Sequence, residues 1–82
     1  MNLYLISQGI NDDYDTYSDA VVAADTAEDA AAIHPNGRDK LVPGFKDNRT
    51  WTSNINEVSV KLIGHALEGT PAGVICSSFH AG

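Results

Sequence analysis

Short apolar segments alternate with polar, turn-rich segments along the whole chain. Residues 2–8, NLYLISQ, alternate so that apolar side chains fall on both faces of an extended strand. Residues 19–25, DAVVAAD, repeat this pattern with smaller side chains, which is typical of a strand in the middle of a sheet. The first part of the chain therefore predicts two strands, joined by a polar and acidic loop over residues 9–18.

A short helix is expected directly after the second strand. Thr26 and Asp29 have the spacing of a capping box, and the helix would run through AEDAAAI. Pro35 and the turn after it would end the helix near His34. One longer helix over residues 18–34 is the alternative, but the paired valines and the internal cap favour a strand followed by a helix.

Two further strands are predicted in the second half of the chain. Residues 57–67, EVSVKLIGHAL, alternate most clearly, which indicates one buried face and one largely wet face. The buried face would carry Val58, Val60 and Leu62, and the wet face Ser59, Lys61, Ile63 and His65. Residues 73–80, GVICSSFH, form the last strand, which we expect to pair with the third strand as a hairpin.

Residues 35–56 have no clear period, and a connection of this length in a compact domain is usually functional or partly structured. We expect apolar side chains to tie it to the domain, namely Leu41, Val42, Phe45 and Trp51. Trp51 would plug the end of a small core, and residues 50–53 would form a short strand. Together the elements predict a single α+β domain over residues 1–82 with the order β-β-α-β-β. Its four-stranded, mostly antiparallel sheet has one short helix packed on one face.

Negative charge is concentrated in the first half of the chain. Residues 1–37 contain seven carboxylates and no Lys or Arg, residues 38–82 carry a net charge of +1, and the whole chain carries −6. Such a surface repels nucleic acid and anionic membranes, so we expect neither as a direct ligand. It suits a protein partner with a basic surface. The alternative is that the charges only keep the protein soluble.

Candidate chemical sites are weak. Asn11, Asp13 and Asp15 begin like a calcium-binding loop, but Thr16 stands where such a loop needs glycine and Val22 where it needs glutamate. The three histidines and the single cysteine match no zinc-ligand spacing. Phosphate-loop, dinucleotide and nucleophile-elbow motifs are absent from the sequence, so we expect no enzyme activity, no cofactor and no metal centre.

Three of the polar residues receive structural interpretations instead. His34 is expected to close the C-terminus of the helix, where a cation is favoured. His65 is expected on the wet face of its strand, and Cys76 is expected to be a buried, unreactive residue. With one cysteine, no signal-peptide pattern and no apolar run of membrane-spanning length, the sequence predicts a cytoplasmic protein.

The most specific feature is the stretch DDYDTYSD at residues 12–19, in which tyrosines alternate with carboxylates. Tyrosine is enriched at binding hot spots, and carboxylates steer a basic partner towards a surface. The predicted partner-binding surface consists of Asp12, Asp13, Tyr14, Asp15, Tyr17 and Asp19. The alternative is a solvated loop in which Tyr14 or Tyr17 folds back onto the sheet.

Three stretches together carry a resemblance: YLISQ at residues 4–8, DTYSDAVVAA at residues 15–24 and SSFHAG at residues 77–82. They resemble a family of small, uncharacterised phage and prophage proteins. Small acidic phage proteins are often inhibitors of host machinery, including anti-CRISPR and other anti-defence proteins. The resemblance therefore implies a protein that binds a basic, nucleic-acid-handling host protein in the bacterial cytoplasm. A small structural or accessory protein, assembling as a homo-oligomer through a sheet edge, is the alternative.

Overall fold

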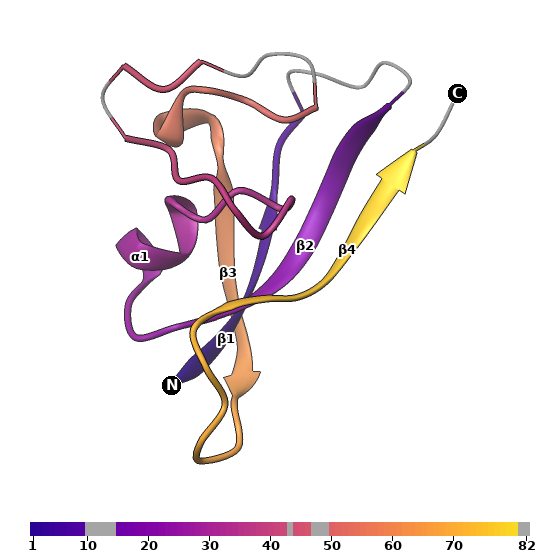
Figure 1. Ribbon diagram of the computed structural model, residues 1–82. Helices are drawn as coiled ribbons and strands as arrows, with labels where there is room; N and C mark the ends of the chain where they lie inside the picture. Colours follow the sequence, from indigo (N-terminus) through magenta and orange to yellow (C-terminus); the bar gives the residue numbers. More distant parts are fainter. Residues whose placement is uncertain (10–14, 43, 47–49, 81–82) are drawn as a thin grey trace.

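The structure, a computed structural model, describes residues 1–9, 15–42, 44–46 and 50–80. Four strands form one antiparallel sheet in the order β3-β1-β2-β4 (Figure 1). The elements are β1 (Asn2–Ser7), β2 (Thr16–Ala24), α1 (Ala27–Ala31), the short 3₁₀ turn η1 (Ile55–Glu57), β3 (Ser59–His65) and β4 (Gly73–His80). The predicted α+β class and the order β-β-α-β-β are confirmed, and a single helix over residues 18–34 is excluded.

One face of the sheet is covered and the other is open. Figure 1 shows α1 and the connection between Ile33 and Val58 on the same side of the sheet. The core beneath them consists of Tyr4, Ile6, Ala20, Val22, Ala24, Ala30, Leu41 and Trp51. In a cluster otherwise built mainly from aliphatic residues, the indole of Trp51 is the largest side chain and is fully buried, as predicted for a core plug.

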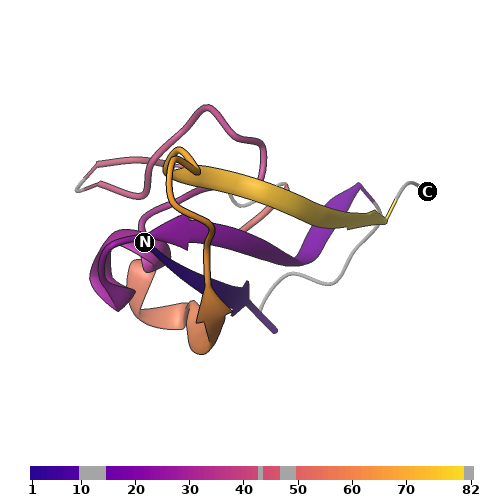
Figure 2. The same cartoon turned by 90° about the horizontal axis from the view of Figure 1, so that it is seen from below.

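The predicted hairpin between the last two strands is wrong. β3 pairs with β1 and β4 pairs with β2, so these two strands form opposite edges of the sheet (Figure 2). The hydrogen bond from Ala66 N to Met1 O, at 3.0 Å, holds the start of the segment that crosses from one edge to the other. Neighbours in sequence commonly pair, but the hairpin of β1 and β2 has two free edges, and each of the later strands covers one of them.

Extra residues interrupt the strand ladders at Ser18 in β2, Ile63 in β3 and Ile75 in β4. One extra residue reverses the inward and outward alternation beyond it. For this reason His65 lies opposite Asn2, on the covered face, instead of on the face predicted from strict alternation. Its side chain is nevertheless exposed, and Nδ1 lies 2.8 Å from Asn2 Oδ1.

The helix starts at the predicted cap. The Asp29 backbone N–H donates to Thr26 Oγ1 at 3.1 Å, and Thr26 has the extended conformation of an N-cap. The helix is shorter than expected because the chain turns away after Ala31, and Leu41 N then donates to Ala32 O at 2.8 Å. Among the described helices, none has the length and apolar character that crossing a bilayer requires.

Apolar side chains anchor the connection between α1 and β3 to the core largely as expected. Leu41 is buried and Phe45 is half-buried against the core, whereas Val42 is 53% exposed and does not anchor the segment. Residues 50–53 are not a strand. A backbone hydrogen bond from Tyr17 N to Thr50 O, at 2.8 Å, attaches them to β2.

Candidate functional site

Half of the predicted partner-binding residues lie outside the described part of the chain: Asp12, Asp13 and Tyr14. Asp15 is exposed at the entrance to β2 and has a φ of 61°, a left-handed conformation that Asp adopts more readily than most residues. Asp19 is half-buried on the open face of the sheet, with Ser7 and Ser78 as its cross-strand neighbours. The structure therefore presents Asp15, and in part Asp19, towards solvent.

Tyr17 packs back onto the fold. Its side chain is half-buried, and its ring contacts those of Phe79 and His34, with centroids 4.8 and 6.0 Å away. Both contacts are edge-on, with interplanar angles of 62° and 89°, a geometry that stabilises aromatic pairs. This is the alternative arrangement expected for one of the two tyrosines of residues 12–19. The ring of Tyr17, a residue of β2, therefore contacts both β4 and the long connection.

His34 lies fully buried at the centre of this aromatic cluster. Its ring also contacts Phe45 and Trp51, with centroids 5.9 and 6.4 Å away. The prediction that His34 closes α1 is wrong, because the helix ends at Ala31 and the imidazole turns inward instead.

Hydrogen bonds fix the orientation of the buried imidazole. The backbone N–H of Asn36 donates to His34 Nδ1 at 3.0 Å, so in the neutral ring the proton is on Nε2, 3.4 Å from Thr50 Oγ1. The side-chain oxygen of Asn36 accepts from the backbone N–H groups of Arg38 and Asp39, at 2.8 and 3.0 Å. These bonds build the tight turn that follows His34, and they make this histidine a structural residue.

No pattern in the sequence predicted the aromatic cluster. Its members come from two strands and the long connection, and no period relates them: Tyr17, His34, Phe45, Trp51 and Phe79. The composition gave one indication of it: the chain has only two Phe and one Trp, and all three belong to the cluster.

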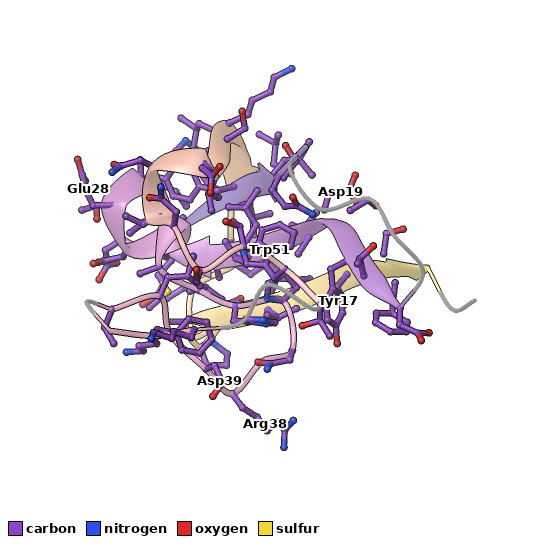
Figure 3. All side chains as sticks on the ribbon, turned by 90° about the horizontal axis from the view of Figure 1, so that it is seen from above. Tyr17, Asp19, Glu28, Arg38, Asp39 and Trp51 are labelled. Carbon is purple, nitrogen blue, oxygen red and sulfur yellow. The ribbon has the colours of Figure 1, made fainter. Side chains whose placement is uncertain are left out.

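A second acidic group surrounds the start of α1. Asp25, Glu28 and Asp29 are all exposed and form no ion pair with any residue that the structure describes. The Thr26 hydroxyl makes the cap, to which Asp29 contributes its backbone N–H. Figure 3 shows Glu28 and Asp19 well apart, so the described carboxylates of residues 15–29 form two separate groups.

Cys76 is exposed, and the prediction that it is buried is wrong. It lies on β4, an edge strand, opposite Val21 on the open face of the sheet. A shallow hollow of about 150 Å³ lies beside these two residues. An apolar sequence context does not bury a side chain when no second layer covers that face.

A larger pocket of about 370 Å³ opens in the connection and is lined mainly by Leu41, Val42, Phe45 and Ile55. None of the described residues that line it has an ionisable side chain, so these residues offer no group for acid–base chemistry. Within the described ranges, no three His, Cys, Asp or Glu side chains gather as a metal site would require.

Comparison with known proteins gave no relative: no family model, no curated protein and no solved structure matches the chain. The resemblance to phage proteins therefore stays a prediction from the three short stretches.

Proposed function

We propose that the protein is a binding protein that contacts a basic, nucleic-acid-handling protein through the acidic end of β2. The observation that carries the proposal is that the exposed Asp15 and Phe79, which is 46% exposed, lie at the same end of the β2–β4 pair. Thr16, the next residue after Asp15, pairs with His80, the next residue after Phe79. An exposed ring next to a carboxylate combines an apolar contact with an attraction for Lys or Arg.

The remaining carboxylates extend this surface. Asp19 follows on β2, and residues 12–14 supply two more carboxylates and a tyrosine just before Asp15. A basic surface that handles nucleic acid is built to bind phosphates, and a cluster of carboxylates competes for the same Lys and Arg side chains. Inhibition of a host defence protein, with anti-CRISPR activity as one form, follows from this competition and from the phage resemblance. The proposal includes no catalytic step, no cofactor and no direct contact with nucleic acid.

The test compares two variants that remove three negative charges each. In the first, Asp12, Asp13 and Asp15 are changed to Asn, which also tolerates the left-handed conformation at residue 15. In the second, Asp25→Asn, Glu28→Gln and Asp29→Asn remove the same charge at α1. After a partner has been identified by pull-down, association rates are measured for both variants at low and high salt.

The first variant should associate at least several-fold more slowly at low salt, and the difference should shrink as salt screens the charges. The second variant should lose much less. Equal losses would show that only net charge matters, and unchanged association of the first variant would refute the proposed surface.

A second candidate function, assembly of identical copies through a sheet edge, is favoured by a separate observation. Both edge strands expose large apolar side chains: Leu62 and Ile63 on β3, and Ile75 and Phe79 on β4, each between 46% and 54% exposed. Exposed apolar side chains on a free edge favour pairing with another strand.

A further inference from the structure

The two free edges of the sheet differ in how well they are protected. Edge strands avoid unwanted pairing mainly through charged side chains, prolines and bulges. β3 carries Lys61 near its middle, whereas β4 has no Asp, Glu, Lys, Arg or proline along its whole length. Each strand has one bulge, at Ile63 and at Ile75, so the charge is what distinguishes them. β4 is therefore the less protected edge.

The side chains of β4 are arranged for contact with a second strand. All five residues from Ile75 to Phe79 are exposed. The two large apolar side chains stand at the ends of this run, 50% and 46% exposed, and the three residues between them are small: Cys76, Ser77 and Ser78. In Figure 1, β4 lies at the margin of the sheet on the side away from α1.

We propose that β4 pairs with β4 of a second copy of this chain, antiparallel and about a two-fold axis at Ser77, to give a continuous eight-stranded sheet. In this register Ser77 faces its own counterpart, Cys76 faces Ser78, and Ile75 faces Phe79. The exposed apolar side chains at the two ends of the run then cover each other across the axis. The proposal rests on the second candidate function, and it names the edge and the register.

Charge does not oppose the pairing of a second copy at this edge. Each copy carries a net charge of −6, so two copies repel wherever their acidic surfaces meet. β4 brings no carboxylate to the interface. Among the described residues, the carboxylate in register with this run is Asp19 on β2, and three strand spacings separate it from its counterpart. That distance is at least about 14 Å, which exceeds the Debye length of about 8–10 Å in physiological salt.

The contact area predicts a weak dimer. Stable interfaces bury about 1,200–2,000 Å² in total, and the pairing of one edge strand buries less. The dimer should therefore form in a concentration-dependent way, and a covalent trap is the most direct way to detect its register.

The trap is Ser77→Cys in a Cys76→Ser background. Residues directly opposite in an antiparallel pair have Cα atoms about 4.5–5.5 Å apart, within the range of disulfide bonds. Mild oxidation should convert this variant into a cross-linked dimer. The matched control is Ser59→Cys in the same background, an exposed serine on β3, and it should give at least tenfold less dimer.

A charge variant gives a second, reversible measurement. Ser77→Lys places two like charges at the axis, and Ser59→Lys places the same charge on the other edge. Sedimentation velocity over a concentration series should show wild-type dimer, at least tenfold weaker association for Ser77→Lys, and unchanged association for Ser59→Lys.

The outcomes separate the inference from the functions proposed above. If Ser59→Cys cross-links and Ser59→Lys weakens association, while the Ser77 variants do neither, pairing through β4 is refuted and the sheet-edge homo-oligomer stands. If wild type is monomeric at every concentration and neither cysteine variant cross-links, both the register and the homo-oligomer are refuted. A partner that adds its own strand to β4 would give this last result too. Neither outcome tests the carboxylates of the acidic surface, although a β4 dimer would cover the ring of Phe79 and leave Asp15 and Asp19 to the partner.

Discussion

Phe79 of β4 packs edge-on against Tyr17 of β2, with ring centroids 4.8 Å apart. The same tyrosine ring also contacts the ring of His34, with centroids 6.0 Å apart. Tyr17 therefore joins an edge strand to the buried aromatic cluster, although its sequence neighbours are acidic and polar. Two nearby residues of the stretch DDYDTYSD therefore differ in their surroundings: Asp15 is exposed to solvent, whereas the ring of Tyr17 stabilises the fold.

The first prediction concerns Tyr17. Replacement by Ala removes a half-buried ring and its two aromatic contacts, and should lower the free energy of unfolding by about 2 kcal/mol. In a domain of this size, that change corresponds to a fall in melting temperature of roughly 8–16 °C. Tyr17→Phe keeps the ring and should change stability by less than about 1 kcal/mol, as measured by urea denaturation. A Tyr17→Ala variant as stable as wild type would contradict the packing described here.

His34 should be one of the least replaceable residues. His34→Ala opens a cavity among three aromatic rings and leaves the Asn36 N–H without its acceptor, so we expect a loss of about 3 kcal/mol. The exposed His65, which makes one surface contact with Asn2, serves as the control. His65→Ala should cost less than about 1 kcal/mol. Comparable losses for both histidines in chemical denaturation would argue against a central structural role for His34.

Asp15 tests the left-handed backbone at the entrance to β2. A β-branched residue is strained at a φ of 61°, so Asp15→Val should lower the free energy of unfolding by about 1–2 kcal/mol. Asp15→Asn and Asp15→Gly tolerate this conformation and should stay within about 0.5–1 kcal/mol of wild type. Equal stability of all three variants in urea would mean that the left-handed turn is not retained.

Cys76 should react readily in the folded protein. Because the thiol is exposed on an edge strand, a chromogenic thiol reagent should label it fully without denaturant, at a rate within about tenfold of that in the unfolded chain. Cys76→Ser should change stability by less than about 1 kcal/mol. Protection of the thiol at low protein concentration, where dimers dissociate, would show that the side chain is covered within one copy.

The elements with strong local signals could be predicted from sequence. Apolar residues on both faces of an extended segment indicated β1 and a central β2, and the Thr26 cap indicated the start of α1. The predicted partner-binding surface stays a prediction, and Asp12, Asp13 and Tyr14 lie outside the described residues. Of the others, Asp15 is exposed, and Tyr17 turns inward because it packs against aromatic partners from the connection and β4.

By itself, the sequence determined the class of the fold, the positions of its strands and helix, and the concentration of negative charge in the first half. These properties follow from side-chain period, caps and turn residues, which act over a few neighbouring positions. The tertiary structure decided which strands form the edges, that Cys76 is exposed, that His34 is buried, and that the bulge at Ile63 carries His65 to the covered face. The physical reason is that strand order and burial depend on which distant surfaces cover one another, and no local pattern records that competition.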